Sequence, residues 1–146
     1  MESNTTRLPG VGKQAAASVL AVDDQPAFLG AVRELVQATG EMVIVGEAES
    51  GERAVELVEQ LRPDLVLMDV RMPGMGGVRA ARAIKSAHPS TVVVLVSTAA
   101  ADEFPADADD CLADARVCKC ELRPGLLVQL WRRHGARRAD DATSPE

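Results

Sequence analysis

Aromatic residues are almost missing from this sequence, which has two phenylalanines, one tryptophan and no tyrosine among its 146 residues. Hydrophobic residues still make up 47% of the chain, so it can bury a core, and that core must be aliphatic. The same content argues against wholesale disorder. The length suits a single domain.

Long hydrophobic runs and an excess of basic charge are absent as well. No run approaches the ~20 apolar residues of a membrane-spanning helix, and the segment after Met1 lacks the continuous apolar stretch of a secretory signal. The net charge of −6 argues against a nucleic-acid surface, which needs clustered lysine and arginine. We therefore expect a cytoplasmic protein without membrane contact or direct nucleic-acid binding.

Cysteine is scarce, with Cys111, Cys118 and Cys120 as its only occurrences. An odd number in a cytosolic chain argues against a disulfide framework. Cys118 and Cys120 could form half of a metal site, but no second Cys/His pair has the spacing of a zinc site. Buried or incidental thiols are the better interpretation.

The chain alternates between short apolar runs and segments with helical periodicity. Strands are predicted at 18–24, 42–45, 65–69, 91–97 and 115–118. Helices are predicted from Pro26 to Gly40, from a Ser50 cap to Pro63, over 78–88, from about Pro105 within an acidic stretch, and from Pro124 onward. This alternation predicts a parallel α/β sheet with right-handed crossovers and helices on both faces.

Polar residues stand where four of the predicted strands end. Asp23 and Asp24 follow the first strand, Asp69 ends the third, Ser97 ends the fourth and Lys119 follows the fifth. The carboxyl ends of parallel strands share one edge of the sheet, and open α/β sheets bind ligands there. Three carboxylates, a hydroxyl and an ammonium at one edge favour a metal and phosphoryl site.

Each of these residues has a plainer interpretation when taken alone. Paired aspartates are common in turns and helix caps, and a single lysine is usually solvated. Asp69 is harder to explain in that way, because a carboxylate that ends an apolar strand is costly to bury unless it is paired or metal-bound. The joint pattern, with one group at each strand end, is what favours a functional site.

With these motifs the sequence resembles the receiver domain of two-component response regulators. The matching segments are Val22-Asp23-Asp24, Met68-Asp69-Val70-Arg71-Met72-Pro73-Gly74-Met75, Val96-Ser97 and Lys119, within a similarity that covers about residues 17–134. The resemblance implies a flavodoxin-like, doubly wound, five-stranded parallel sheet of order 2-1-3-4-5. Residues 1–16 would then be a flexible leader and residues 135–146 a flexible tail.

The resemblance also implies a role for each motif residue. Asp69 is expected to be the phosphoacceptor. Asp24, Asp69 and the backbone carbonyl of Arg71 are expected to bind Mg²⁺, with Asp23 acting through water. These assignments suit the preference of Mg²⁺ for hard oxygen ligands, and a carboxylate nucleophile would give a labile acyl phosphate.

Two further residues receive roles, and two others depart from the family pattern. Ser97 is expected to be the switch hydroxyl, and Lys119 is expected to pair with Asp69 and then with the phosphoryl oxygens. Cys120 stands where the family usually has a proline, so a cis bond is not expected there. Arg116 stands where the family usually has an aromatic switch residue.

The resemblance implies a binding module switched by phosphorylation, without enzymatic activity beyond its own phosphorylation and dephosphorylation. A sensor histidine kinase or phosphotransfer protein would be the donor, and the downstream protein stays unknown. A phosphorylation-dependent homodimer is one option for the output. Because few residues follow the last predicted helix, a stand-alone receiver is expected.

Two other functions compete with this one. A haloacid-dehalogenase-like phosphohydrolase also has a nucleophilic aspartate after an apolar strand, but it needs a second aspartate two residues later, where this chain has Arg71. A receiver-like interaction module that works independently of phosphorylation stays open, because the carboxyl-terminal third departs from the family pattern.

Overall fold

Five parallel strands form the centre of the computed structural model, which describes residues 16–98 and 112–143. The strand order is β2-β1-β3-β4-β5, so the predicted doubly wound topology is confirmed. The strands are β1 (Ala17–Val22), β2 (Met42–Ala48), β3 (Leu65–Asp69), β4 (Val92–Ser97) and β5 (Ala115–Cys118).

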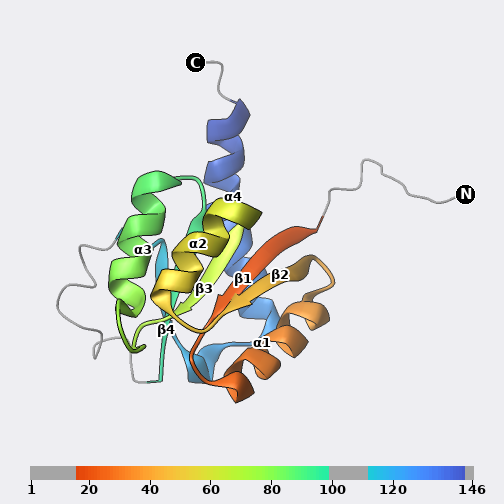
Figure 1. Ribbon diagram of the computed structural model, residues 1–146. Coiled ribbons are helices and arrows are strands. Elements are labelled where there is room, and N and C mark those ends of the chain that lie inside the picture. The colour runs from red at the N-terminus through yellow and green to blue at the C-terminus, as the bar shows by residue number, and fades with distance from the viewer. Residues whose placement is uncertain (1–15, 99–111, 144–146) are drawn as a thin grey trace, which may run out of the picture.

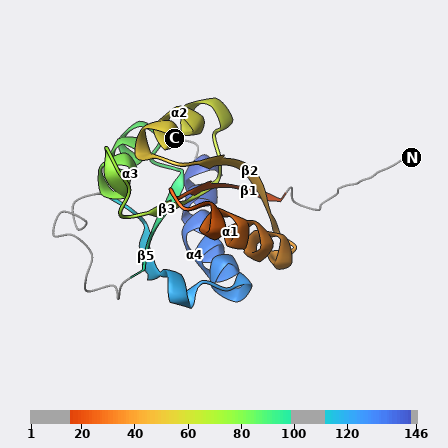
Figure 2. The same ribbon diagram turned by 60° about the horizontal axis from the view of Figure 1, so that its bottom comes forward.

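Helices cover both faces of the sheet, as predicted (Figures 1 and 2). Helices α2 and α3 lie on one face, and α1 and α4 lie on the other. The helices are α1 (Pro26–Thr39), α2 (Gly51–Leu61), α3 (Gly76–Ala87) and α4 (Pro124–Thr143), with one 3₁₀ turn, η3 (Lys119–Glu121), between β5 and α4. None of these described helices has the length and apolarity to traverse a lipid bilayer.

The core is aliphatic and divided into two layers by the sheet. Every residue of β3 and β4 is buried, which is expected of central parallel strands with a helix layer on each face. Alternate residues face opposite layers, so that Met68 packs with α2 and α3 whereas Leu67 packs with α1 and α4. The continuous apolar runs of the sequence follow from this double burial.

The predicted ends of the first two helices are confirmed. Pro26 opens α1, and Gly40 closes it in the left-handed conformation at φ 69°. The Ser50 hydroxyl accepts a hydrogen bond from the Arg53 backbone N–H at 3.1 Å and so caps α2.

Several boundaries differ from the prediction. Strand β2 continues to Ala48, because its ladder with β1 extends that far. Helix α4 continues to Thr143, through most of the predicted tail, where alanine and arginine favour a helix. The domain limits stay predictions. The predicted leader lies outside the described residues except for its last position, and so does most of the acidic stretch with its predicted helix.

Gly77 allows the start of α3 to approach the end of β3. A Cβ atom at this position would lie 1.9 Å from the carbonyl oxygen of Asp69, so no side chain fits there. The backbone N–H of Gly77 donates to the Val70 carbonyl at 2.9 Å. This contact fixes the loop that follows Asp69.

Replacing Gly77 with alanine should therefore lower the free energy of unfolding by about 3 kcal/mol, because the clash is with backbone that cannot rotate away. Urea denaturation measures the change. Gly30→Ala is the matched control, since the nearest atom to its Cβ would be the Arg33 guanidinium at 3.8 Å. That variant should gain about 1 kcal/mol of helix propensity. Equal stability of the two variants would contradict the close approach.

Candidate functional site

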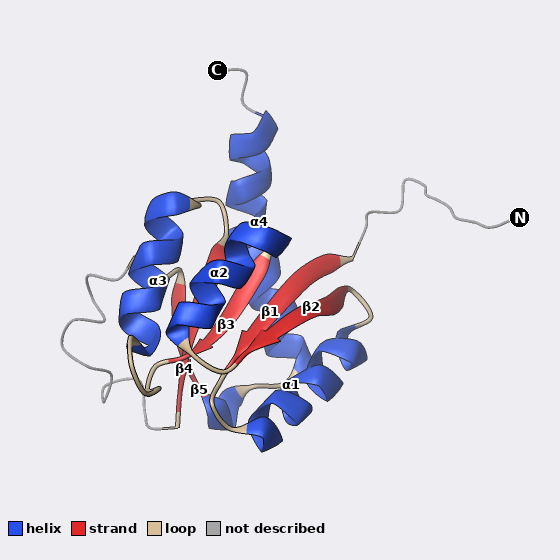
Figure 3. Cartoon of the chain, viewed as in Figure 1, coloured by secondary structure: helices blue, strands red, loops and turns tan. Residues whose placement is uncertain are grey.

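The parallel strands end at one edge of the sheet (Figure 3), and the structure brings the predicted strand-end residues together there. A cleft of about 180 Å³ opens there. Its walls carry carboxylate, hydroxyl, ammonium and backbone groups from the segments that follow four strands. The lining residues are Asp24, Gln25, Asp69, Arg71, Ser97, Thr98 and Lys119.

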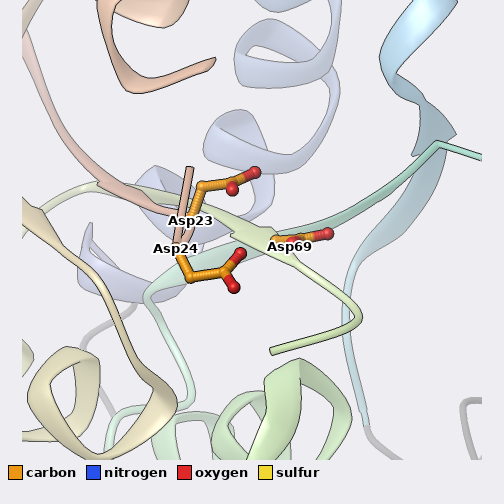
Figure 4. A group of neighbouring side chains, drawn as sticks. All are labelled: Asp23, Asp24 and Asp69. Atoms are coloured by element: carbon orange, nitrogen blue, oxygen red, sulfur yellow. The ribbon is translucent and has the colours of Figure 1, made fainter. Parts of the chain in front are cut away.

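Three aspartates form the acidic side of this edge (Figure 4). Asp23 and Asp24 follow β1 and Asp69 ends β3, and a carboxylate oxygen from each lies within 4.8 Å of the others. Asp23 is fully buried and Asp69 is 7% exposed, whereas Asp24 is open to solvent. Among the described residues this is the one group of three or more side chains able to hold a metal ion. Its donor set consists of hard oxygens, which suits Mg²⁺.

Lys119 provides the positive charge at the edge. Its Nζ lies 2.7 Å from Asp23 Oδ2 and 4.1 Å from the centre of the Phe28 ring. Asp23 Oδ1 accepts a hydrogen bond from the Gln25 N–H at 2.8 Å, whereas buried Oδ2 has no donor in hydrogen-bond alignment. The resemblance implied an ion pair with Asp69, but the structure places the ion pair on Asp23.

Asp69 titrates abnormally because of this environment. Burial is the largest cause and the Asp23 charge comes next, and together they raise the pKa of Asp69 to about 6. The Lys119 charge and a hydrogen bond from the Arg71 backbone N–H lower the pKa of Asp69. The Asp24 charge raises it further. Asp69 is therefore ionised at neutral pH at a cost in stability.

The loop after Asp69 is fixed by a residue of another helix. Gly74 has a φ of 79°, which favours glycine, and the Glu52 carboxylate of α2 accepts a hydrogen bond from the Met75 N–H at 3.1 Å. No feature of the sequence pointed to Glu52 as the residue that holds this loop.

The position of Phe28 beside Lys119 was not predicted from the sequence either. Phe28 lies on α1, and no local signal predicts its contact with Lys119, which lies far along the chain. The described residues contain no cis peptide bond, so the Lys119–Cys120 bond is trans, as expected.

A sequence profile of the response regulator receiver domain matches residues 19–130 of this chain. The chain belongs to the response regulator receiver domain family. The response regulator GacA of Pseudomonas viridiflava is 39% identical over 87 residues, which are 60% of this chain and 41% of GacA. The nitrate/nitrite response regulator protein NarL of Escherichia coli K12 is 34% identical over 119 residues, which are 82% of this chain and 55% of NarL.

This receiver chain thus spans about half the length of the curated relatives it matches.

Solved structures agree with the assignment. The signal receiver domain of a NarL response regulator from Mycobacterium tuberculosis superposes with a TM-score of 0.75 at 30% identity, covering 84% of this chain and 98% of that one. A CheY-like receiver protein from Methanospirillum hungatei JF-1 has a TM-score of 0.75 at 20% identity, which shows the shared fold.

The raised pKa of Asp69 predicts a pH-dependent gain in stability for Asp69→Asn. The folded wild type binds a proton more readily than the unfolded chain, so its stability falls as pH rises from about 4 to above 6. The variant has no carboxyl group at this position to ionise, so its stability does not fall in this way. In metal-free buffer it should be more stable than the wild type by about 1–3 kcal/mol at pH 7, and the difference should vanish near pH 4.

Urea denaturation across this pH range checks the prediction. Asp24→Asn is the matched control, because its carboxylate is exposed, and its stability should change much less. A stability gain for Asp69→Asn that is the same at pH 4 and pH 7 would show that ionisation of Asp69 is not its cause.

Proposed function

We propose that this receiver domain accepts a phosphoryl group on Asp69 in a Mg²⁺-dependent reaction and so switches the binding of a partner. The observation that supports this most is the composition of the cleft. An acidic cluster, a buried hydroxyl and an ammonium line one cleft at the carboxyl edge of the sheet. Phosphoryl transfer needs such positioning and charge neutralisation more than it needs covalent chemistry.

Asp69 is the proposed nucleophile. Its carboxylate oxygen attacks the phosphorus of the donor, the bond from phosphorus to the leaving group breaks, and an acyl phosphate forms on Asp69. The Arg71 backbone N–H donates to the same carboxylate and orients it. Burial keeps water away from the carboxylate, which strengthens its interactions with nearby charges.

The acidic cluster is the proposed Mg²⁺ site. Asp24, Asp69 and the backbone carbonyl of Arg71 would be ligands, and Asp23 would act through water. Three carboxylates meet here and one ammonium pairs with Asp23, and this excess of negative charge supports a cation in the cluster. The bound ion would supply positive charge for the developing charge of the phosphoryl oxygens.

Lys119 and Ser97 would hold the transferred group. The Lys119 ammonium, now on Asp23, would turn to an oxygen of the phosphoryl group, because that group carries more negative charge than one carboxylate. The Ser97 hydroxyl is buried at the end of β4, beside the cleft, and would donate a hydrogen bond to another oxygen. That bond would draw Ser97 toward the phosphoryl group and so begin the conformational response at the end of β4.

The proposal also covers the proteins that this receiver domain would bind. We expect a sensor histidine kinase or phosphotransfer protein as donor, a cytoplasmic location, and a downstream protein that the sequence does not name. Phosphorylation-dependent homodimerisation is one form the output can take. Receiver-like binding that does not depend on phosphate is the alternative, because Arg116 and Cys120 depart from the family pattern.

Incubation with acetyl phosphate and Mg²⁺, followed by intact-mass measurement, tests the proposal. The wild type should gain one phosphoryl group, and Asp69→Asn should gain none. Lys119→Met should react on the order of 100-fold more slowly, because it lacks the ammonium that stabilises the transferring group. Glu56→Gln, on the exposed face of α2, is the control and should react like the wild type.

Labelling of Asp69→Asn to the wild-type level would refute the site. A wild type that gains no phosphoryl group, with or without Mg²⁺, would favour the phosphate-independent alternative.

A further inference from the structure

Two thiols lie on either side of Lys119 and touch each other. Cys118 ends β5 and Cys120 lies within η3, and their sulfur atoms are 2.6 Å apart. Both cysteines are free. The function proposed above uses neither of them, although the lysine between them is central to it.

Local backbone geometry holds the two sulfurs together. Cys118 is extended, at φ −86° and ψ 142°, and the chain then turns into η3, so that both side chains lie on one side. The Cys118 sulfur accepts a hydrogen bond from the Cys120 N–H at 3.3 Å, and the Cys118 N–H donates to Glu121 Oε1 at 3.1 Å. A disulfide bond is ~2.05 Å long, and two sulfurs already in contact can close one with a small rearrangement.

The two thiols differ in accessibility. Cys118 is buried, whereas Cys120 is exposed and lines an open groove of about 660 Å³ together with Phe28 and Lys119. A small oxidant can therefore reach Cys120 and not Cys118. The hydrogen bond between the thiols is the main reason that the pKa of the Cys120 thiol is raised.

We propose that Cys118 and Cys120 are a modification site that forms a reversible disulfide with a low-molecular-weight disulfide as oxidant. Cys120 gives up its proton and attacks one sulfur of the oxidant, which releases one thiol and leaves a mixed disulfide. Cys118 then attacks the Cys120 sulfur, expels the second thiol and passes on its own proton. Two electrons move from the cysteine pair to the oxidant, and two small thiols leave.

The disulfide would act on the phosphorylation site through Lys119. Ring closure fixes the backbone on both sides of this residue while its ammonium lies on Asp23. This consequence rests on the proposed function, because it assumes that Lys119 must turn toward the phosphoryl group. Exposed or strained disulfides are generally the labile and regulatory ones, which fits an easily reversed switch.

The bond itself is tested without any phosphodonor. Cys111→Ser leaves only the two thiols of interest. After incubation with oxidised glutathione, its intact mass should fall by the mass of two hydrogen atoms, with no glutathione attached, and dithiothreitol should restore it. Cys111→Ser/Cys118→Ser should instead accumulate one glutathione adduct, and Cys111→Ser/Cys120→Ser should react much more slowly because its remaining thiol is buried.

Unchanged thiols in Cys111→Ser, a stable glutathione adduct or a covalent dimer would each overturn the disulfide. The coupling is tested by acetyl phosphate labelling of reduced and oxidised Cys111→Ser, and we expect the oxidised form to react at least threefold more slowly. Equal rates in the two forms would overturn the coupling. Labelling of neither form would count against the proposed function, while the mass measurement still decides the disulfide.

Discussion

The ion pair between Lys119 and Asp23 is the interaction on which the rest of the site depends. It places one ammonium beside a fully buried carboxylate, while two further carboxylates stand within reach of the same space. One positive charge does not balance three negative ones, and the pKa of Asp69 is raised to about 6, first by burial and then by the charge of Asp23. Buried like charges destabilise a fold, and the proposed metal and phosphoryl site would explain why this edge carries that cost.

The fold supplies the rigidity that such an arrangement needs. Asp69 ends a strand whose residues are all buried, and Gly77 lets α3 begin directly against the carbonyl of Asp69. Glu52 holds the loop that follows. The carboxylates are thus carried by strand ends and anchored loops rather than by mobile segments, and a site built on such elements keeps its geometry when charges change.

Sequence reasoning predicted the sheet and the set of residues at its edge, because apolar runs, caps and strand-end polar groups are local signals, whereas the strand order was implied by the family resemblance. It did not predict that Lys119 contacts Phe28 and Asp23, or that two cysteines judged incidental touch each other. Those contacts join distant segments or depend on a turn after β5 that departs from the family pattern. Helix α4 also extends past its predicted end. Residues 135–146 were predicted as a tail because they are polar, although their alanine and arginine residues favour a helix.

Binding of Mg²⁺ tests the central claim, that the unbalanced carboxylates form a cation site, most directly. In a titration of the metal-free protein followed by backbone amide NMR, the account predicts saturable binding of one ion, with the largest shifts at residues 23–24 and 69–71. The Asp69→Asn substitution should weaken Mg²⁺ binding severalfold or more, because one of the charged ligands is lost. Shifts confined to Cys118 and Cys120, or none at millimolar Mg²⁺, would contradict the account.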